Sequence, residues 1–289
     1  MATGQDRTAL LFPGQGSPLD GEAELVARFA PELGELAAEL TGTDPFAGAS
    51  SSTRLAQPAI YCAGIARWIG AGRPEPDCMA GHSLGELTAL AAAGSWSLED
   101  GLRVVCERGR SMEEASEPSE TMLALRADAE QAAEIALAAG VVVANDNAPG
   151  QQVLSGSRSD LERAERLAGE RGSRSMLLPV AGAFHSPSMS AAVGPFRLAL
   201  ADLPPAPPRL PVVSSGSARP FGSDIAAELV AALTSPVRWR ELSIGLTERG
   251  VRRFVEVGPG KVLSGLVRRT VPEADVSVLE PLPAGVAGG

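Results

Sequence analysis

The pattern of apolar and polar positions alternates between short apolar runs and longer amphipathic stretches, which is typical of an α/β protein. Apolar runs predict strands at residues 8–12, 78–80, 211–214 and 254–257. Helical spacing predicts helices at residues 21–40, 58–71, 84–93, 97–115, 223–233 and 239–249, with another beginning at 261. Because the strand at 78–80 and the helix after it carry almost no charge, we expect both to be buried.

In the middle of the chain, the predicted strands and helices follow one another in a different order. Strands are predicted at residues 121–125, 141–144, 152–154 and 175–178, and helices at 127–139 and 159–172. This β-α-β-β-α-β order is that of a ferredoxin-like unit, inserted between two stretches of the larger pattern.

A G-x-S-x-G pentapeptide, GHSLG at residues 81–85, lies between the predicted strand at 78–80 and the following helix. At such a junction this sequence predicts a nucleophile elbow. A Cβ atom two residues before or after the serine would clash in so tight a turn, so both positions are glycine. Ser83 would then present its hydroxyl at the N-terminus of a helix, whose free amides can stabilise developing negative charge.

The chain contains two histidines, and we expect His185 to be the base that activates Ser83. His82 is adjacent to Ser83 on an extended strand, where neighbouring side chains point to opposite faces, so it is badly placed to take the serine proton. His185 follows the apolar run at residues 176–180, within the hexapeptide GAFHSP at 182–187. Histidine is also the side chain whose ordinary pKa best suits proton transfer near neutral pH.

Five motifs occur along the chain in one order. They are FPGQGS at residues 12–17, GHSLGE at 81–86, ERGR at 107–110, GAFHSP at 182–187 and EVGPGKVLSGL at 256–266. Together they resemble the malonyl-CoA:acyl carrier protein transacylases and the related acyltransferase domains of polyketide synthases, over residues 10–267. The resemblance implies that a malonyl group moves from malonyl-CoA to the phosphopantetheine thiol of an acyl carrier protein through a malonyl-serine intermediate, in fatty acid or polyketide biosynthesis.

The resemblance also implies roles for further residues. The backbone N–H groups of Gln15 and Leu84 would hold the tetrahedral oxyanion. A backbone carbonyl would orient His185, and the family's glutamine at that place corresponds to Ala232 here. Pro18 replaces the glutamine usual after the GQGS serine, and the segment after it is shortened, so the resemblance leaves the substrate and the pathway unassigned.

Arg108 is predicted to bind an anion. On its predicted helix, the positions three and four residues away carry no acid and are Val104, Val105, Ser111 and Met112. A guanidinium among such neighbours needs an anion from elsewhere, and its planar fork suits a carboxylate. The alternative is a long-range ion pair within the fold. The resemblance instead places the malonyl carboxylate at Arg108, and Phe184 before the histidine resembles the malonyl-type pattern.

These observations predict an α/β fold with two units. Residues 1–119 and 185–280 are expected to form a hydrolase-like core with a mainly parallel sheet, and residues 120–184 an inserted ferredoxin-like subdomain. We expect residues 281–289 to be a disordered tail. A cleft between the two units is the natural place for a thioester.

Composition limits the interpretation further. With 289 residues, 44% of them hydrophobic, the chain can bury a large core, and we expect a monomer. The formal net charge of −10 argues against nucleic acid as a general partner. Residues 1–8 are polar and no apolar run approaches a membrane span, so no membrane partner is expected. Cys62, Cys78 and Cys106 lack metal-site spacing, which indicates reduced residues of a cytoplasmic protein without a bound metal or cofactor.

Three alternatives to malonyl transfer stay open at this point. A serine acyl hydrolase, such as a proofreading thioesterase, would use Ser83 with water and an acid, for which Asp146 and Asp160 are candidates. A carrier-docking module without catalysis would not need both Ser83 and His185. A transferase acting in trans could carry another acyl unit. Arg108 argues against the hydrolase, which has little use for a carboxylate anchor.

Carrier proteins of this type are acidic, as this chain is, so docking would need a local basic patch. The candidate patch consists of Arg238, Arg240, Arg252, Arg253, Lys261, Arg268 and Arg269. Alternatively, these cations form a solvated face paired with Glu241, Glu248 and Glu256. Asn145 and Asn147 resemble a family motif near the cleft, but we expect them to brace a turn.

Overall fold

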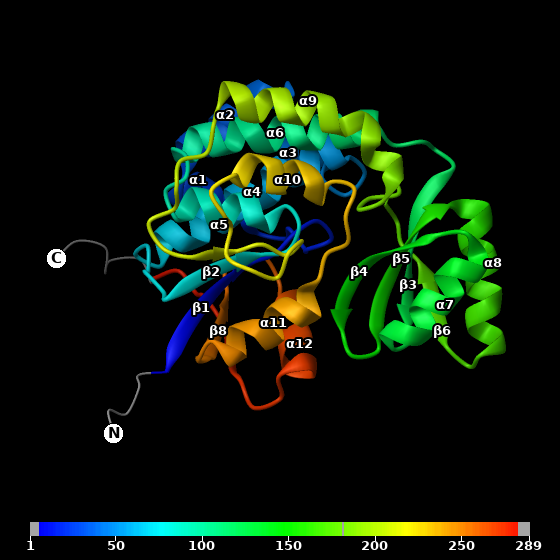
Figure 1. Cartoon of the computed structure of the whole chain (residues 1–289). Helices are drawn as coiled ribbons and strands as arrows, with labels where there is room; N and C mark the ends of the chain where they lie inside the picture. The colour runs from blue at the N-terminus through cyan, green and yellow to red at the C-terminus, as the bar shows by residue number, and fades with distance from the viewer. Residues whose placement is uncertain (1–5, 181, 283–289) are drawn as a thin grey trace.

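Two separate β-sheets organise the chain in the computed structural model, which describes residues 6–180 and 182–282. Within these residues, sheet A has five parallel strands in the order β7-β2-β1-β8-β9. Sheet B has four antiparallel strands in the order β4-β5-β3-β6. Figure 1 shows sheet B beside the larger body that is built around sheet A. The expected α/β class with a mainly parallel sheet is confirmed.

The strands of sheet A come from both ends of the chain. They are β1 (Arg7–Phe12), β2 (Cys78–Gly81), β7 (Val212–Val213), β8 (Val251–Glu256) and β9 (Asp275–Val278). The four strands predicted for the core are all present. The sequence pattern does not predict β9, because this edge strand is short and its side chains are half-buried or exposed, so that no apolar run marks it.

Helices cover both faces of sheet A (Figure 1). One layer contains α1 (Glu22–Phe29), α2 (Pro31–Thr41), α3 (Pro45–Gly48), α4 (Thr53–Gly70), α5 (Gly85–Ala92), α6 (Leu98–Glu114), α9 (Ser190–Asp202) and α10 (Ile225–Ala232). The other contains α11 (Trp239–Glu248) and α12 (Val262–Thr270). Leu10 and Phe12 of β1 pack into the first layer, whereas Ala9 and Leu11 pack into the second. Burial on both faces explains why β1 is a continuous apolar run.

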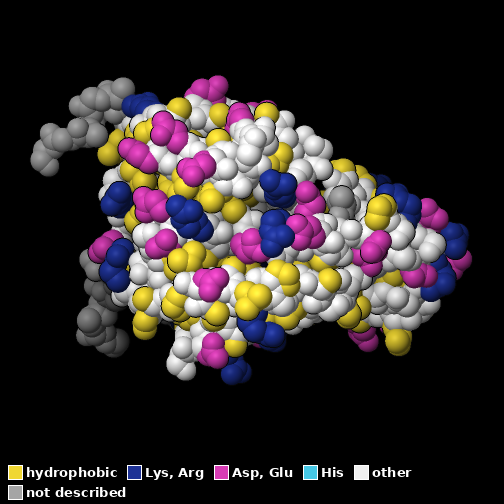
Figure 2. Space-filling view, turned by 90° about the horizontal axis from the view of Figure 1, so that it is seen from above, with side chains coloured by type: hydrophobic (Ala, Val, Ile, Leu, Met, Phe, Trp, Pro, Cys, Tyr) yellow, Lys and Arg dark blue, Asp and Glu magenta, His cyan; other side chains and the backbone are white. Residues whose placement is uncertain are grey.

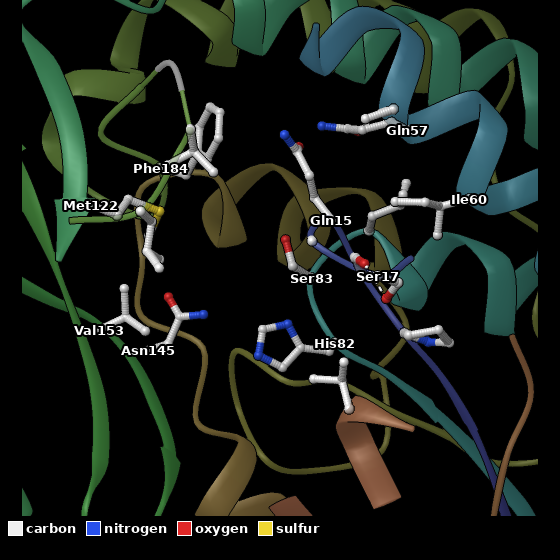
Figure 3. A pocket seen from close by; sticks show the side chains of 18 of the residues that line it. Gln15, Ser17, Gln57, Ile60, His82, Ser83, Met122, Asn145, Val153 and Phe184 are labelled. Carbon is white, nitrogen blue, oxygen red and sulfur yellow. Dashed lines mark hydrogen bonds between the residues drawn. The ribbon is translucent and has the colours of Figure 1, made fainter. Parts of the chain in front are cut away.

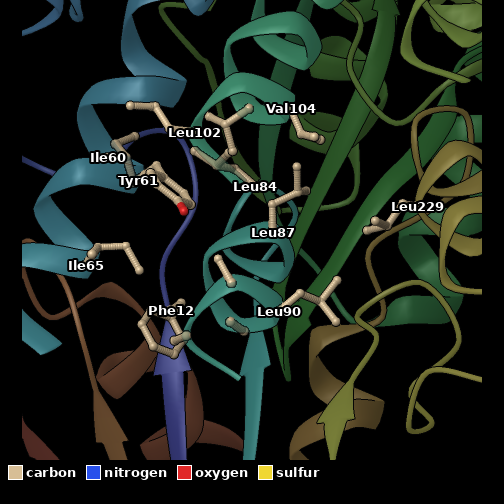
Figure 4. Close-up of a cluster of buried hydrophobic side chains, with 14 of the residues drawn as sticks. Phe12, Ile60, Tyr61, Ile65, Leu84, Leu87, Leu90, Leu102, Val104 and Leu229 are labelled. Carbon is tan, nitrogen blue, oxygen red and sulfur yellow. The ribbon is translucent and has the colours of Figure 1, made fainter. Parts of the chain in front are cut away.

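The first layer packs around α5, every residue of which is buried. Figure 4 shows Leu87 and Leu90 of α5 in one cluster with Phe12 of β1 and Tyr61 of α4. A helix that is buried all round has no polar stripe, which agrees with its nearly uncharged sequence. Because α5 is enclosed in this way, the turn that precedes it is held in place.

Sheet B and its two helices form the inserted unit. The strands are β3 (Glu120–Arg126), β4 (Val142–Ala148), β5 (Gln151–Ser157) and β6 (Arg174–Leu177). The helices α7 (Ala129–Ala139) and α8 (Arg158–Glu170) cover one face of the sheet. The predicted β-α-β-β-α-β order is therefore confirmed. The other face, which includes Met122, Ala124 and Val153, lines a cleft.

The first two predicted helices need correction. Residues 21–40 form two helices, because the backbone breaks at Ala30, with φ at −150°, and Pro31 begins α2. The helix predicted from residue 58 begins earlier, because Ser52 caps it with its side chain. Pro58 therefore lies inside α4, where it forgoes one backbone hydrogen bond.

Helix α9 and the end of the chain also differ from the prediction. α9 contains Gly194 and Pro195, two residues that interrupt a helical pattern, although its apolar side chains pack in the core. Of the tail expected at 281–289, residue Leu282 is held in place, because its backbone N–H donates to the carbonyl of Gly70 at 2.8 Å. The rest of that tail lies outside the described residues. No helix in the described part of the chain is long and apolar enough to cross a membrane.

Candidate active site

β2 and α5 meet in a sharp turn at Ser83, whose backbone φ is 53°. A side chain on Gly81 would overlap the backbone of Gly85. A side chain on Gly85 would in turn overlap the carbonyl oxygen of Phe12 on β1. The tight strand-to-helix turn predicted from the pentapeptide is therefore present, and the packing requires glycine at both positions.

Ser83 and His185 meet although they are 102 residues apart in the chain. Ser83 Oγ lies 2.8 Å from His185 Nε2. On the other side of the ring, Nδ1 lies 2.9 Å from Ala232 O and 3.2 Å from Ser235 O. A carbonyl oxygen can only accept a hydrogen bond, so Nδ1 carries the proton and Nε2 can accept one from the serine. Ala232 lies where the resemblance expects it, and Ser235 is a second acceptor that sequence analysis did not indicate.

The surroundings of His185 lower its pKa to about 3. Burial is the main cause, since only 5% of the residue is exposed, and the positive charge of Arg108 acts in the same direction. The hydrogen bond from Nδ1 to the carbonyl of Ala232 opposes both effects. At neutral pH the imidazole is therefore uncharged, which is the form that can accept a proton.

Arg108 on α6 is 3% exposed and contacts two neutral side chains. One guanidinium nitrogen donates to Gln57 Oε1 at 2.8 Å and another to Ser83 Oγ at 3.1 Å. Among the residues that the structure describes, no carboxylate lies within 4.0 Å of it, so the alternative of a long-range ion pair is not observed. Burial lowers the pKa of Arg108 to about 10, and the charge of Glu86 partly offsets this. The guanidinium is thus ready to bind an anion in the cleft.

Gln57 is a site residue that sequence analysis did not single out. It is buried on α4, where its Oε1 accepts from Arg108 and its Nε2 lies 3.3 Å from Met112 Sδ. The amide therefore fixes one edge of the guanidinium. The available signal was a lone amide in an otherwise small or apolar stretch, at residues 55–60.

His82 directs its ring away from Ser83. Its Nε2 lies 2.8 Å from Asn147 Oδ1, and its ring lies beside Trp239 with the centroids 5.5 Å apart. This geometry agrees with the expectation that His82 is badly placed as the base. Asn145 and Asn147 lie within β4 and line the cleft, so the expectation that they brace a turn is wrong. The reason is that β4 continues beyond its predicted end by pairing with β5 through two register shifts.

A cleft of about 770 Å³ lies between the core and sheet B. Figure 3 shows Ser83 facing into it, with Gln57 of α4 on one side and Met122 and Val153 of sheet B on the other. Arg108 and His185 also line it, so the three predicted side chains share one cavity. Its volume is in the range of small-molecule sites, and its mixture of apolar walls and a few polar groups suits an acyl chain.

The backbone N–H groups of Gln15 and Leu84 are available beside the nucleophile. Leu84 directly follows Ser83 at the N-terminus of α5. The loop after β1 packs on the elbow, since a side chain on Gly14 would overlap the carbonyl oxygen of His82. Neither N–H donates a hydrogen bond to another group in the described part of the chain. Both can therefore donate to an oxyanion, as the resemblance implies.

Two arginines face each other across neighbouring strands of sheet B. Arg126 of β3 is directly opposite Arg174 of β6 in the antiparallel register. Met122 and Ala124 line the cleft, so Arg126, further along the same strand, lies on the cleft side of the sheet. Both arginines are exposed, and neither forms an ion pair with any described residue. Like charges directly opposite are unfavourable, so this pair is a candidate anion site that only the strand register reveals.

The predicted basic patch is partly neutralised. Its ion pairs are Arg238 with Glu241, Arg240 with Asp146, and Arg253 with Asp275. Glu256 is not such a partner, because it is buried and accepts two backbone N–H groups at the start of α12. Lys261, Arg268 and Arg269, all at or on α12, have no acidic partner within 4.0 Å among the described residues.

The two aspartates that a hydrolase could use lie away from His185. Asp146 accepts hydrogen bonds from Arg240 and Gln152, and Asp160 lies in the first turn of α8. The acceptors of His185 Nδ1 are backbone carbonyls instead. Within residues 6–180 and 182–282, no group of three or more His, Cys, Asp or Glu side chains is arranged to hold a metal ion.

Known proteins are similar to this chain in sequence and fold over nearly its whole length. Residues 23–284 match the sequence model of the acyl transferase domain. The chain is 38% identical to the malonyl CoA-acyl carrier protein transacylase of Bacillus subtilis (strain 168), over 91% of the chain and 90% of that protein. It is 37% identical to the polyketide biosynthesis protein ThaF of Burkholderia thailandensis, over 94% of the chain but only 25% of that longer protein. The crystal structure of malonyl-CoA:acyl carrier protein transacylase from Xanthomonas oryzae has a TM-score of 0.87 at 37% identity, covering 98% of this chain and 97% of that one.

Proposed function

The chain belongs to the acyl transferase domain family, and from this premise we propose that it moves a malonyl group from coenzyme A to the phosphopantetheine thiol of an acyl carrier protein. It is an acyltransferase. Malonyl CoA-acyl carrier protein transacylases, one of them named for polyketide biosynthesis, align over nearly the whole chain, which supports fatty acid or polyketide synthesis as the pathway. The proposal includes Ser83 as the nucleophile and His185 as the general base.

The observation that carries the proposal is the position of Arg108. A buried guanidinium without a carboxylate partner among the described residues lies 3.1 Å from the oxygen of Ser83. An acyl group bound at Ser83 with a carboxylate at its far end would supply the missing anion. A malonyl group has such a carboxylate, and an acetyl group does not.

In the first half of the proposed reaction, the thioester carbonyl of malonyl-CoA lies beside Ser83. His185 Nε2 takes the hydroxyl proton as Oγ attacks the carbonyl carbon. The backbone N–H groups of Gln15 and Leu84 stabilise the oxyanion of the tetrahedral intermediate. The intermediate collapses when the carbon–sulfur bond breaks, and the coenzyme A thiolate leaves with the proton from His185. A malonyl ester of Ser83 remains.

In the second half, the thiol of the carrier's phosphopantetheine arm takes the place of coenzyme A. His185 accepts the thiol proton as sulfur attacks the ester carbonyl. Collapse of this intermediate breaks the bond to Ser83 Oγ, which takes the proton back from His185. The carbonyls of Ala232 and Ser235 keep the imidazole in the required tautomer through both halves.

We place the phosphates of coenzyme A near the Arg126–Arg174 pair. The pair lies on the cleft side of sheet B and lacks an acidic partner among the described residues, and phosphate oxygens are the natural anion for two adjacent guanidinium groups. The thioester end would then lie deeper in the cleft, toward Ser83. This arrangement needs no bound metal or cofactor.

The proposal extends to the organisation of the protein. We regard residues 1–119 and 185–280 as a hydrolase-like core, because strand, elbow and helix follow one another there, and residues 120–184 as a ferredoxin-like subdomain. We propose a monomer, because one chain supplies Ser83, His185 and Arg108 to the same cleft. We propose a cytoplasmic location, because the three cysteines are all unpaired.

A serine acyl hydrolase is the second candidate, and the structure offers it less support. Neither Asp146 nor Asp160 orients His185, so the chain lacks the acid that completes the usual hydrolase triad among its described residues. Arg108 would also be a buried charge without a use. A transferase for another carboxyacyl unit shares the geometry and is distinguished by its substrate.

The test is intact-mass spectrometry of the protein after it is mixed with malonyl-CoA. We expect the mass to rise by one malonyl group in the wild type and in Ser17→Ala, which changes another serine that lines the cleft. Ser83→Ala should not gain mass. Released coenzyme A without an adduct would indicate a hydrolase, and no reaction at all would indicate a docking module. If the protein formed an adduct with another carboxyacyl-CoA in preference to malonyl-CoA, that carboxyacyl group would be its substrate.

A further inference from the structure

The carbonyl groups that orient His185 belong to one short connection between α10 and α11, which we call the orienting loop (residues 232–238). Ala232 and Ser235 provide the acceptors for Nδ1, at 2.9 and 3.2 Å. Pro236 follows Ser235 directly and fixes the local backbone φ angle. The position of the imidazole therefore depends on where this loop is held.

The far end of the orienting loop is attached to sheet B. The backbone N–H of Val237 donates to Ala144 O at 2.9 Å, and the backbone N–H of Asp146 donates to Val237 O at 2.9 Å. These bonds make an isolated parallel bridge between Val237 and Asn145 of β4. Only Pro236 separates the bridged residue from Ser235, so a shift at the bridge would reach the carbonyl that His185 contacts.

A bidentate ion pair lies beside this contact between the orienting loop and β4. Arg240, in the first turn of α11, contacts both carboxylate oxygens of Asp146 at 2.7 to 2.9 Å. Gln152 of β5 donates a further hydrogen bond to Asp146 at 2.8 Å, which fixes the carboxylate. The side chains of Arg240 and Asp146 are 34% and 21% exposed, so the pair is partly shielded from water. Charge-assisted bidentate pairs of this kind fix geometry as well as adding energy.

We propose that Asp146 and Arg240 are positioning residues for His185. The pair holds the start of α11 against β4, the bridge at Val237 holds the orienting loop, and the loop holds the imidazole toward Ser83. Neither side chain lines the cleft, so neither contacts the substrate. This inference rests on the proposed function, since it assigns the pair a part in the same transfer reaction.

The first test compares steady-state kinetics of malonyl transfer for variants that break the pair from either side, Arg240→Met and Asp146→Asn. Displacement of a catalytic group by a fraction of an ångström to about 1 Å costs up to roughly a hundredfold in rate, so we expect kcat to fall by about tenfold or more. The KM for malonyl-CoA should stay within about twofold, because no substrate contact is lost. Arg240→Lys keeps the charge but not the bidentate fork, so it should recover only part of kcat.

The matched control is Arg67→Met. It breaks the bidentate, partly buried ion pair of Arg67 on α4 with Glu22 on α1, which has no connection to the orienting loop. We expect its kcat and KM to equal those of the wild type. Equal losses of kcat in Arg67→Met and Arg240→Met would overturn the proposal, because the effect would then be one of general stability.

The second test observes His185 directly and does not depend on activity. The chain has only two histidines, so labelling with ¹⁵N-histidine gives NMR signals from two rings. In the wild type we expect a slowly exchanging Nδ1 proton on His185, held by the two carbonyls. In Arg240→Met and Asp146→Asn this proton should exchange faster and its resonance should move upfield.

The two measurements separate the proposal from the proposed function. If both variants are folded and keep the wild-type kcat and Nδ1 signal, the pair is merely structural and the inference is wrong. If the wild type forms no malonyl adduct, the proposed function fails, but the NMR result still decides whether Asp146 and Arg240 hold His185. Should Arg240→Met not fold, Asp146→Asn provides the same comparison, because it keeps the size of the side chain but removes the negative charge and one of the two acceptor oxygens.

Discussion

Ser83 Oγ accepts a hydrogen bond from Arg108 and donates one to His185, so a single oxygen atom connects the anion site to the base. In the proposed reaction, a substrate carboxylate that reaches Arg108 would replace the serine as the partner of the guanidinium. It would also cancel part of the positive charge that lowers the pKa of His185. Binding of a dicarboxylic acyl group would therefore strengthen the base in the same step in which it fixes the substrate.

Arg108→Ala should weaken the use of malonyl-CoA far more than that of acetyl-CoA, since only malonyl has a carboxylate to lose. Truncating one partner of a buried, hydrogen-bonded charge pair costs about 2–5 kcal/mol, so the ratio of the two kcat/KM values should shift by at least about tenfold. Competition between the two substrates measures this ratio. Arg103→Ala, an exposed arginine on the same helix, is the control and should leave it unchanged. Equal losses for both substrates would show that Arg108 is structural.

The low pKa of His185 predicts an unusual pH dependence of kcat/KM for formation of the malonyl enzyme. A base is active only when unprotonated, and the lowered pKa keeps His185 unprotonated well below neutral pH. We expect kcat/KM to stay level from pH 8 down to about pH 5, whereas a histidine with an ordinary pKa near 6.5 would lose roughly tenfold per unit below it. Arg108→Ala removes one of the causes that lower the pKa of His185, so the inflection in kcat/KM should move to higher pH. An inflection near pH 6.5 in the wild type would contradict the burial argument.

Much of the site could be predicted from single residues whose chemistry conflicts with their surroundings. Ser83 lies between obligatory glycines, His185 is one of two histidines, and Arg108 has no acidic neighbour on its helix. Gln57 was not predicted as a site residue, because an amide in a helix does not by itself conflict with its surroundings. Ser235 could not be found, since it contributes only a carbonyl group, which every residue has.

Among the elements, those with a strong internal pattern were predicted and those that depend on neighbours were not. The inserted β-α-β-β-α-β unit was predicted because each strand and helix has its own periodicity. Helix α9 was missed because Gly194 and Pro195 interrupt its pattern and only tertiary packing stabilises it. Edge strand β9 was missed because its pairing with β8, and not burial, makes it a strand.

The pairing of β3 with β6 gives a prediction that no single strand could provide. Arg126→Ala and Arg174→Ala should each raise the KM for malonyl-CoA, because each removes a cation from the proposed phosphate site. A malonyl thioester of N-acetylcysteamine has no phosphate, so its KM should stay nearly unchanged in both variants. Loss of one charged contact typically costs about 1.5–3 kcal/mol when buried and less when exposed, so we expect an increase of about three- to tenfold.

The control for this strand pair is Arg158→Ala, at the start of α8 on the same subdomain. It should alter neither KM. If Arg126→Ala raised the KM for both thioesters equally, the arginine would support the shape of the cleft and would not bind phosphate.

Over the molecule as a whole, positively and negatively charged side chains are mixed and are not separated into regions of one sign. The net charge is −10, yet Figure 2 shows basic and acidic side chains interspersed over the helical face. Three predicted patch cations are neutralised by ion pairs. Of the other patch cations, Arg252 lies on β8, whereas Lys261, Arg268 and Arg269 lie at or on α12. α12 also contributes Val262 and Leu266 to the wall of the cleft, so we propose α12 as the docking face for the carrier.

Docking of an acidic carrier on α12 predicts that Lys261→Glu combined with Arg268→Glu raises the KM for the carrier protein. The effect should grow as ionic strength falls, because screening weakens surface charges. Formation of the malonyl enzyme from malonyl-CoA should not change. Arg269 is left intact in this variant, since it contacts Gln151 at the cleft and could affect both substrates.

A charge reversal away from α12 provides the comparison for docking. Arg252→Glu, on β8, adds the same charge change per residue and should leave the carrier KM unaltered. Carrier kinetics that do not depend on ionic strength in the wild type would exclude α12 as the docking face.

The position of β1 in sheet A affects how the chain folds during its synthesis. β1 leaves the ribosome before the other strands of sheet A, but it pairs with β2 on one side and with the late strand β8 on the other. At a synthesis rate of about 5–20 residues per second, its second edge stays open for roughly 10 to 50 seconds while nearly the whole chain is produced. β1 is one of the most apolar segments in the sequence. Chaperones should therefore need to protect its open edge in newly made chains until β8 has been synthesised.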